Sequence, residues 1–565
     1  MRRELLSGAL LLMTGAWGDN RQCAWDQWGQ SAAHDGEICT VAQPANRELA
    51  HLTFDPFVEP EMAESFGLSA HYQVPLADEE DNVFMMAKIG SYDSCDPPGS
   101  GEPFPCGPDN LATQIWTEKR LRWQGGHLVE KWTFTSDWKP FPVPPWESMF
   151  QPALSGPFIY VPGAGGSVWQ VLKVVGLPIQ RIKPFPTIDA GTYVGGGITT
   201  DRFGFIYWNV IRVDPVTAER HSFLVKAAPW GQTRMVAYET LTPGAPAATD
   251  LCYLSFRNAS PRPARPWPPA DQPDGSPTLP PQVPCGAQQA GVNVTPAIGA
   301  DGTIFTASHA AATANYSYLI AVKPDLSPRW SVSLRDRVND GCGVLYPIGT
   351  MPGDCREGTA FGVDPLTNLT PALRVDDQSS SSPVALPDGG VIYGTVDDYW
   401  GQGKLVKVDA AGHFAGLYTF GWDVTPALYH HDGTYSIILK DNIYNSFGPY
   451  FITQLSKDLT VEWQFQNTST ERCQRNPDGT VTCVDATDEN PDGFEWCVNA
   501  PAVDAAGNVY VTSEDGNFYA IGQGGVLLGK HFLNIAEGAA YTPLALDPQG
   551  RIYTLQNGEL TVLGR

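Results

Sequence analysis

The run Asp488-Glu489-Asn490-Pro491-Asp492-Gly493 has the spacing of a calcium-binding loop. In such loops the side-chain oxygens at alternate positions converge on one ion, and the glycine permits the turn. The glutamate expected at the twelfth position is replaced by Asn499, so Glu495 or Asp485 would have to substitute for it. We therefore predict a calcium site at Asp488, Asn490 and Asp492, with an acidic, solvated loop as the alternative.

His430 and His431 form a second candidate for metal binding. Adjacent residues on a strand point to opposite faces, and a turn at Asp432-Gly433 follows, so a polar turn is the favoured interpretation. The sequence contains no G-x-S-x-G or H-E-x-x-H motif. It therefore predicts no catalytic residue and leaves any cofactor-binding residues unknown.

Eleven cysteines fall into local groups. A zinc site would need tight CxxC pairs, which the chain lacks, whereas disulfides are typical of exported proteins. Cys483 and Cys497 bracket the calcium-type loop and could hold it, and the last group leaves one odd cysteine. Connectivity stays open. The disulfide candidates are Cys23, Cys39, Cys95, Cys106, Cys252, Cys285, Cys342, Cys355, Cys473, Cys483 and Cys497.

The N-terminus has the features of a secretory signal. Met1-Arg2-Arg3 is followed by an apolar run from Leu5 to Ala16, and Ala16-Trp17-Gly18 offers small residues at the positions that a signal peptidase reads, with cleavage near Gly18. The run is too short to span a bilayer. We expect residues 1–18 to be a signal peptide and the protein to be exported, to a periplasmic, cell-surface or extracellular location.

Composition supports a folded protein made of short strands and many turns. The 565 residues include 57 glycines and 49 prolines, 11% are aromatic and only 17% are charged. An apolar share of 42% excludes a disordered chain. The formal net charge of −25 argues against nucleic acid and against anionic membrane surfaces as partners.

A repeat is the main signal in the chain. Each copy has a proline, an apolar strand, a glycine turn, a second strand with an aromatic residue, and further strands. Asp-Gly or Ala-Gly supplies the positive φ of a tight hairpin, and proline can begin a strand. Copies begin at Pro296, Pro383, Pro426, Pro501 and Pro543, with weaker ones at Pro75, at Pro152 and near Gly197.

Four antiparallel strands in each copy make a blade of a β-propeller. The third strands include 405–408 and 518–521, and the fourth often carries a tryptophan, as at Trp132, Trp330 and Trp463. We predict an all-β fold with eight blades, seven being the alternative. The last copy has only three strands, so residues 49–54 should supply the fourth and close the ring.

The organisation that follows is a single propeller over residues 49–565, preceded by a disulfide-bearing segment, 19–48. Insertions are expected at about 90–112, 245–290, 335–380 and 467–498, each with one of the cysteine groups. A local disulfide lowers the entropic cost of ordering a long loop.

The segment 513–521, after Gly507-Asn508-Val509-Tyr510, resembles the PQQ-like, or quinoprotein-type, β-propeller repeat. Residues 25–30, with His34-Asp35-Gly36, also resemble the opening of such proteins. The catalytic branch of that family, the alcohol dehydrogenases, implies adjacent disulfide-bonded cysteines, a calcium or lanthanide ion and an aspartate base. This chain has no adjacent cysteines. It also lacks the repeated Thr-Gly-Lys of tryptophan docking, and its turns read Asp-Leu-Ser at 325–327 and Gly-Gln-Gly-Gly at 522–525.

The chain is more similar to the non-catalytic branch, which resembles an outer-membrane assembly factor and binds other proteins. We therefore expect a secreted binding or scaffold module for a protein or other extracellular ligand. The alternative is an oxidoreductase dependent on PQQ or a metal, with its site on the propeller axis. PQQ is not expected and calcium is possible, and the sequence identifies neither the partner nor the oligomeric state.

Overall fold

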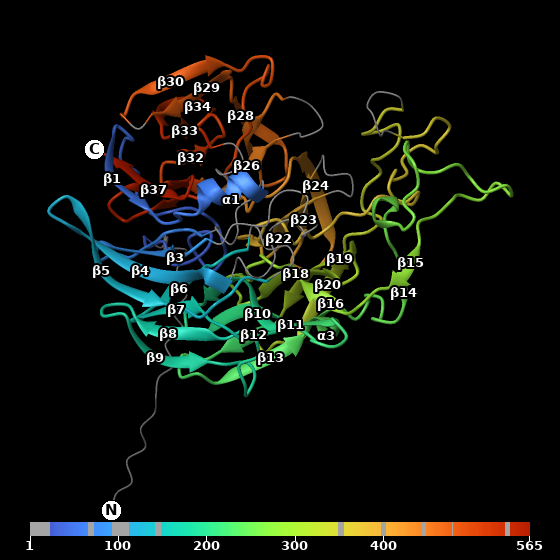
Figure 1. Ribbon diagram of the computed structural model, residues 1–565, viewed down its shortest axis with the longest axis horizontal. Helices are drawn as coiled ribbons and strands as arrows, with labels where there is room; N and C mark the ends of the chain where they lie inside the picture. Colours follow the sequence, from blue (N-terminus) through green and yellow to red (C-terminus); the bar gives the residue numbers. More distant parts are fainter. Residues whose placement is uncertain are drawn as a thin grey trace, which may run out of the picture.

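The computed structural model describes residues 23–65, 73–92, 112–141, 148–348, 355–396, 403–442, 448–476, 478–536 and 543–565. Within them, eight antiparallel sheets form a ring around a common axis (Figure 1). Each sheet is one blade of a β-propeller, so the predicted all-β fold and its eight blades are confirmed. The predicted signal peptide, 1–18, lies outside the described residues.

The blades are numbered along the chain and their strands are given from the axis outward. Blades 1 to 4 are β2 (Leu76–Ala77), β3 (Asn82–Gly90), β4 (Gln114–Gln124), β5 (His127–Thr135); β6 (Ala153–Ser155), β7 (Phe158–Pro162), β8 (Val168–Leu172), β9 (Leu177–Ile182); β10 (Thr192–Thr200), β11 (Ile206–Val213), β12 (Arg220–Ala227), β13 (Thr233–Ala237); and β16 (Gln288–Ala290) with β17 (Ala297–Ile298), β18 (Ile304–Ala310), β19 (Thr313–Val322), β20 (Pro328–Ser333).

Blades 5 to 8 are β21 (Val384–Ala385), β22 (Val391–Thr395), β23 (Gly403–Val408), β24 (Phe414–Phe420); β25 (Ala427–His431), β26 (Thr434–Asp441), β27 (Phe451–Ser456), β28 (Val461–Gln466); β31 (Ala502–Val503), β32 (Val509–Thr512), β33 (Asn517–Gly522), β34 (Val526–Phe532); and β35 (Ala545–Leu546), β36 (Ile552–Gln556), β37 (Glu559–Gly564), β1 (Arg47–Thr53). The remaining elements are the helices α1 (Val58–Ser65) and α3 (Tyr238–Leu241), the 3₁₀ turn η1 (Phe256–Asn258), and the hairpins β14 (Leu251–Tyr253) with β15 (Gln282–Pro284) and β29 (Glu471–Arg475) with β30 (Val481–Asp485).

The two ends of the chain close the ring, as predicted. β1 pairs antiparallel with β37 and supplies the outer strand of blade 8. The predicted segment, 49–54, therefore forms most of this strand. Pairing removes the open edge that the three-stranded last repeat would leave.

In six of the eight blades, 1, 3, 4, 5, 7 and 8, an aspartate side chain closes the first turn of the repeat. Asp301 Oδ1 accepts a hydrogen bond from the Thr303 amide at 2.9 Å, and Gly302 takes a φ of +81°. Asp504 makes the same bond to the Ala506 amide at 2.9 Å. An aspartate that bonds its own backbone two residues later favours a turn, which explains the Asp-Gly signature of the repeat.

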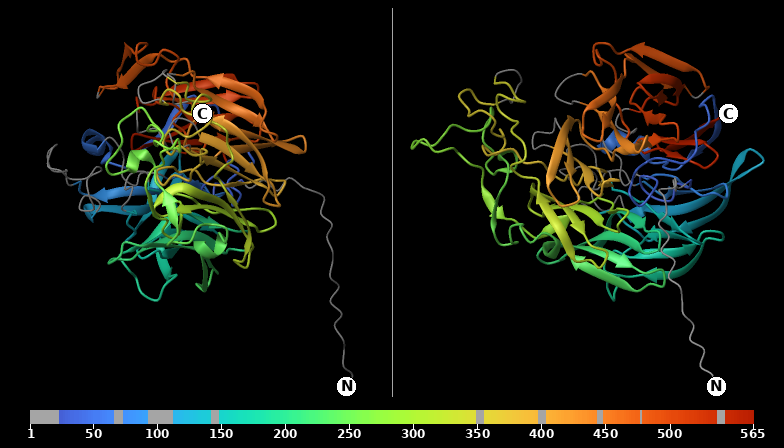
Figure 2. Two further views of the ribbon diagram at one scale, coloured as in Figure 1. Left: turned by 90° about the vertical axis from the view of Figure 1, so that its right-hand side faces the viewer. Right: turned by 180° about the vertical axis from the view of Figure 1, so that it is seen from behind.

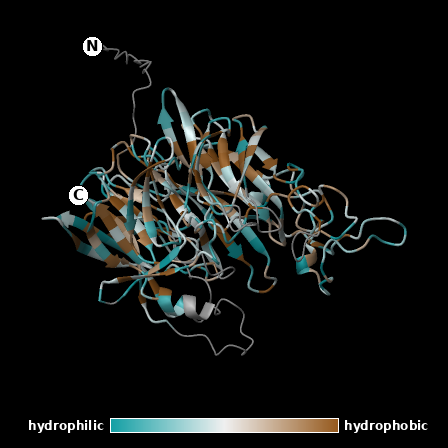
Figure 3. Cartoon of the chain, turned by 90° about the horizontal axis from the view of Figure 1, so that it is seen from above, coloured by the Kyte–Doolittle hydropathy of each residue, from teal (hydrophilic) through white to brown (hydrophobic). Residues whose placement is uncertain are grey.

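Apolar residues lie mainly in the strands of the ring (Figure 3). Their buried side chains form cores between successive blades, which pack face to face. The outer-strand tryptophans join neighbouring blades. Trp132 Nε1 donates to the Lys173 carbonyl of blade 2 at 3.0 Å, and Trp330 Nε1 donates to the Ala410 carbonyl of blade 5 at 3.2 Å. A Cβ on Gly412 would lie 2.7 Å from the Trp330 ring. Tryptophan docking between blades is therefore present, although the Thr-Gly-Lys sequence is absent.

Among the described residues, no helix combines the length and apolar character that crossing a membrane would require.

Candidate binding site

The insertions share one face of the propeller. Strands of an antiparallel blade alternate in direction, so the link from the second to the third strand and the link to the next blade leave from the same face. The insertion at 90–112 joins β3 to β4, and the other three join successive blades. We call this side the insertion face and the opposite side the turn face. Residues 93–111, 349–354 and 477 of these insertions lie outside the described chain.

Disulfides staple the N-terminal segment and three of the insertions. The candidate pair Cys95 and Cys106 lies outside the described residues. Cys497 is a buried thiol. Since Cys483 is bonded to Cys473, the interpretation that Cys483 and Cys497 hold the calcium-type loop is wrong. The four disulfides join Cys23 to Cys39, Cys252 to Cys285, Cys342 to Cys355, and Cys473 to Cys483.

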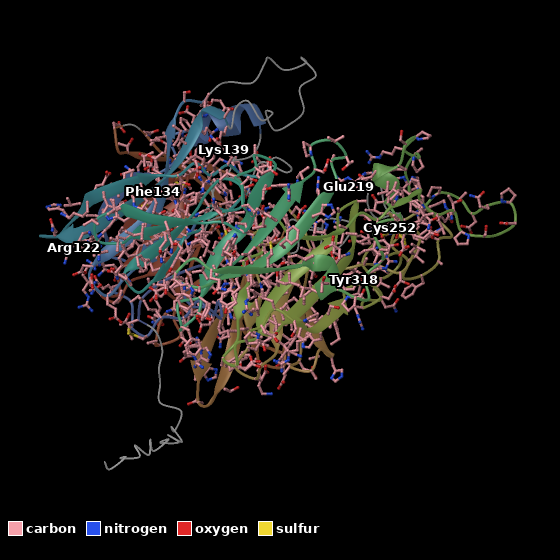
Figure 4. All side chains as sticks on the ribbon, turned by 90° about the horizontal axis from the view of Figure 1, so that it is seen from below. Arg122, Phe134, Lys139, Glu219, Cys252 and Tyr318 are labelled. Carbon is pink, nitrogen blue, oxygen red and sulfur yellow. A yellow bond between two sulfur atoms is a disulfide. The ribbon has the colours of Figure 1, made fainter. Side chains whose placement is uncertain are left out.

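Two insertions pack against each other and project from the ring (Figures 1 and 2). We call residues 251–284 and 355–369 the insertion lobe. Phe256, Trp267 and Leu366 are buried together as its small core. The Phe256 amide donates a hydrogen bond to the Leu366 carbonyl over 2.7 Å. The backbones of Trp267 and Cys355 pair in an isolated parallel β-bridge. Cys252 lies at the root of the lobe (Figure 4). It is buried together with Ala310 of blade 4.

A polar pocket of about 240 Å³ lies beside the lobe on the insertion face. Its lining combines the two insertions with blades 3 and 4, which no local pattern in the sequence indicates. Arg220 begins β12, His309 lies on β18, and the turn before β19 adds further residues. The polar residues that line the pocket are Arg220, Ser255, Asn258, His309, Thr313, Asn315, Arg374, Asp376 and Asp377.

His309 and Asp377 form a buried ion pair in this pocket. His309 Nε2 lies 2.9 Å from Asp377 Oδ1, and its Nδ1 lies 2.9 Å from the Ala310 carbonyl. Burial alone would lower the pKa of His309, but the charge of Asp377 and these hydrogen bonds raise it above its ordinary value. Burial likewise opposes the charge on Asp377, yet the imidazolium lowers the pKa of that carboxyl. Both ring nitrogens face acceptors, so His309 is a fixed cation and not an open general base.

The neighbouring Asp376 differs from Asp377. Burial raises the pKa of Asp376, and the charge of Arg374 opposes this effect. Arg220 donates to the Gln289 side chain at 3.0 Å and stacks on Phe141. The pocket thus presents charges of both signs in fixed positions, an arrangement that suits binding of a polar group.

The N-terminal segment encircles the axis on the turn face. Residues 25–43, here the axial segment, contact the inner part of every blade in chain order. In blade 3 the contact is made by a side chain: the Thr200 amide donates a hydrogen bond to Gln27 Oε1 over 2.7 Å. The sequence predicted a disulfide in this segment and a resemblance of residues 25–36 to the opening of PQQ-like propellers, but not its contacts with the blades. Backbone hydrogen bonds join Trp25 to Ala77, Asp26 to Leu154, Ala32 to Ile298, Ala33 to Ala385, Asp35 to Leu428, Gly36 to Val503 and Gln43 to Gly550.

Buried polar groups surround the axis at the other end of the inner strands. Asp423 Oδ1 accepts from Ser379 Oγ and from the amide and hydroxyl of Ser380 at 2.7–3.0 Å. Its Oδ2 accepts from Asn499 Nδ2 at 3.1 Å. Asp423 and Asn499 therefore form a buried carboxylate–amide network with two serines at this end of the axis. PQQ binding is not tested by this geometry.

The residues of the predicted calcium site lie in the link between blades 6 and 7. Asp488 and Asp492 are exposed and Asn490 is half-buried. Glu489 between them pairs with Arg472 at 2.7 Å. Among the described His, Cys, Asp and Glu residues, three potential ligand atoms lie within 4.8 Å of one another only at Glu471, Cys473 and Cys483, whose two cysteines form a disulfide. Calcium binding at Asp488, Asn490 and Asp492 stays a prediction.

The two histidines of the candidate pair are separated. His430 Nδ1 lies 2.5 Å from Glu37 Oε2 and so helps to fix the axial segment. His431 stacks on Tyr429 and lies 2.9 Å from Ser436 Oγ through its Nε2. The opposite orientation expected from strand geometry therefore holds, and the two rings do not form a shared metal site.

Comparisons with known proteins add little beyond the fold. No protein-family model matches the chain, and no curated protein matches it. Solved structures to which it is similar include BamB from Moraxella catarrhalis (11% identity, TM-score 0.37, covering 85% of this chain and 98% of that one), quinohemoprotein alcohol dehydrogenase from Comamonas testosteroni (9%, 0.46, 96% and 81%) and Sqt1 from Saccharomyces cerevisiae (8%, 0.44, 93% and 99%). The eight blades of the chain itself define it as a β-propeller protein.

Proposed function

We propose that the protein is an exported, non-catalytic propeller that serves as a binding or scaffold module for an extracytoplasmic protein partner. The partner would contact the insertion lobe and the polar pocket. One observation carries the proposal: two disulfide-stapled insertions converge with blades 3 and 4 on a pocket of fixed charges. Exported proteins retain such disulfides, which supports the compartment.

The lobe also exposes a large apolar side chain where a partner could reach it. Phe361 is 73% exposed, and its ring covers Gly343 of the same insertion. Aromatic residues contribute strongly to protein interfaces because they bury much area at little entropic cost. A rigid lobe would also lose little conformational freedom on binding.

Site-specific photo-crosslinking in the producing organism tests this proposal. A benzoylphenylalanine at position 361 should give one reproducible protein adduct, whereas the same group at Val526, exposed on the outer strand of blade 7, should not. The adduct should disappear when Trp267→Ala disrupts the lobe core.

The competing function, a PQQ- or metal-dependent oxidoreductase, makes a different prediction. Purified protein incubated with PQQ and calcium would then oxidise alcohols with a dye as electron acceptor. Such activity, together with the absence of adducts from position 361, would overturn the proposed binding role.

A further inference from the structure

A second pocket lies on the turn face, between blades 3 and 4, away from the insertion lobe. It has a volume of about 300 Å³. Phe205 comes from the first turn of blade 3, and Trp230 comes from the turn between β12 and β13. Asp325 lies in the corresponding turn of blade 4. We call this site the aromatic pocket. None of its residues belongs to the insertions, so it is separate from the site of the proposed function.

The wall of the aromatic pocket is an indole that the fold leaves open to solvent. Trp230 is 70% exposed, and its ring meets that of Phe205 at a centroid distance of 6.2 Å and 66°. Phe203, in the same turn as Phe205, is 68% exposed. Large aromatic side chains exposed together on the surface of a folded protein mark an interaction site, because covering them removes apolar area from water.

Polar side chains beside the rings have hydrogen-bond donors and acceptors that no described residue uses. Gln232 and Arg234 line the pocket, are exposed, and make no side-chain hydrogen bond or ion pair with any described residue. Lys226 Nζ lies 4.5 Å from the centre of the Phe205 ring and donates to the Pro324 carbonyl at 2.8 Å. The pocket therefore offers an amide and a guanidinium to a ligand that also covers an aromatic face.

The size of the pocket favours a small ligand over a protein surface. A stable protein interface buries about 800 Å² on each partner, whereas pockets for small ligands begin at about 300 Å³. The negative face of an indole attracts weakly acidic C–H groups, such as those on one side of a pyranose ring. Hydroxyl groups at the edge of the same ring match an amide such as that of Gln232.

The charges of the pocket favour an acidic ligand. The guanidinium of Arg234 matches a carboxylate in bidentate geometry, and Lys226 adds a second cation. Asp325 opposes them, because the two hydrogen bonds from Ser327 lower the pKa of its carboxyl, and Asp201 also acts on Lys226. The attraction for an anion therefore rests mainly on Arg234, which has no ion pair with any described residue. The net charge of −25 repels anions at long range, yet at physiological salt only charges within about 8 Å act strongly.

We propose that the aromatic pocket binds an acidic saccharide, with the pyranose ring of a uronic acid stacked on Trp230 and its carboxylate paired with Arg234. This site goes beyond the proposed function, which concerns a protein partner on the other face. Gln232 would bond the ring hydroxyls, and Lys226 would add to the attraction for the carboxylate.

Titration calorimetry of the full chain with trigalacturonate and trimannuronate, and with neutral maltotriose, tests the proposal. At least one uronate should bind, and at least about tenfold more tightly than maltotriose. Trp230→Ala should weaken uronate binding at least about tenfold, and Trp230→Phe should weaken it less. Arg234→Gln should weaken the uronate and leave maltotriose unchanged. Val216→Ala, at a residue 90% exposed at the other end of blade 3, serves as the matched control.

Three results would overturn the proposal. They are no binding of either uronate, equal binding of the neutral trisaccharide, and uronate binding that survives both Trp230→Ala and Arg234→Gln. If no uronate binds but a peptide binds in a way that Trp230→Ala abolishes, the pocket is a protein-binding site instead. Because both substituted side chains are exposed, the variants should keep the wild-type melting temperature. Crosslinking from position 361 detects partners of the insertion face only, and calorimetry with uronates tests the aromatic pocket only. The two proposals can therefore fail independently.

Discussion

Trp28 Nε1 donates a hydrogen bond to Thr425 Oγ1 over 3.2 Å, although 397 residues separate the two side chains in the sequence. The contact ties the axial segment to blade 6 from inside the ring. Trp28 is fully buried. The segment therefore acts as part of the core of the propeller, because it fills space on the axis and links all eight blades.

Removing the Trp28 ring should destabilise the whole ring. We expect Trp28→Ala to lower the free energy of unfolding by about 3–5 kcal/mol, as for other buried aromatic residues. Trp28→Phe keeps most of the apolar volume, so it should lower the free energy of unfolding less than Trp28→Ala does. The lost hydrogen bond to Thr425 should account for about 1–2 kcal/mol of that decrease. Urea unfolding followed by circular dichroism measures both. Equal stability of Trp28→Ala and the wild type would contradict a core role for the segment.

His34 should make the axial segment sensitive to acid. Its Nδ1 lies 2.9 Å from the Pro383 carbonyl, its Nε2 has no hydrogen-bond partner among the described residues, and burial lowers its pKa to about 4. Between pH 6.5 and 4 the unfolded chain binds a proton at His34 that the folded chain excludes. The stability that the neutral ring contributes is therefore present above pH 6.5 and is lost as the pH falls towards 4, by about 3 kcal/mol.

The variant His34→Asn keeps a donor for Pro383 and cannot titrate. The stability difference between the wild type and this variant should shrink as the pH falls from 7 to 4. Asp35, whose pKa burial raises to about 6 against the charge of His430, contributes a slope of opposite sign. Because neighbouring titratable groups are not additive, both proteins should be compared in an Asp35→Asn background, which removes this slope. A difference that stays constant from pH 7 to pH 4 would show that His34 is not buried in its neutral form.

The sequence predicted the blades, which short-range patterns specify, but not the contacts of the axial segment, which join residues far apart in the chain. Each blade is specified locally, because residues such as Asp504 and Gly507 close a turn between two apolar strands. The closing strand at 49–54 followed from the missing edge of the last repeat. The axial segment makes its contacts across hundreds of residues, as Trp28 does with Thr425, and no short-range period marks them. His309 and Asp377, 68 residues apart, become neighbours only through blade packing and the paired insertions.

The packing of the Trp330 ring on Gly412 of the next blade predicts how much stability a methyl group at position 412 would cost. Gly412 has a φ of +89°, and a Cβ there would lie 2.7 Å from the Trp330 ring. We expect Gly412→Ala to cost about 2–4 kcal/mol, of which the left-handed backbone accounts for about 1–2 kcal/mol. Gly524, in the equivalent turn of blade 7, has a φ of +77° and no atom within 4 Å of its Cβ position. Gly524→Ala should therefore show the backbone cost alone. Equal melting temperatures for the two variants would argue against the contact with Trp330.

Glu118 should lower stability at neutral pH. It is fully buried on β4, and neither carboxylate oxygen has a hydrogen-bond partner among the described residues. Burial raises its pKa well above the ordinary value of 4.5. The unfolded chain ionises near pH 4.5 while the folded chain keeps the proton, so the stability of the protonated form is lost as the pH rises through the folded pKa.

Glu118→Gln removes this dependence on pH. Its melting temperature should exceed that of the wild type at pH 8, and the gain should disappear at pH 4. Glu130→Gln on the neighbouring strand β5 is the control, since Glu130 pairs with Lys119 at the surface and such pairs contribute little. A lower melting temperature for Glu118→Gln at pH 8 would mean that the carboxylate has a structural partner.

The calcium-type loop gives a prediction that separates the two interpretations of Asp488, Asn490 and Asp492. If these side chains bind calcium, the metal stabilises the folded state by about 2.7 kcal/mol at a concentration of 100 times Kd. The melting temperature should then rise with calcium chloride, fall with EDTA, and lose this response in Asp492→Ala. Asp478→Ala, in the turn of the neighbouring hairpin, is the matched control, because Asp478 bonds only Thr480 among the described residues. A melting temperature that neither EDTA nor Asp492→Ala changes would identify the segment as an acidic, solvated loop.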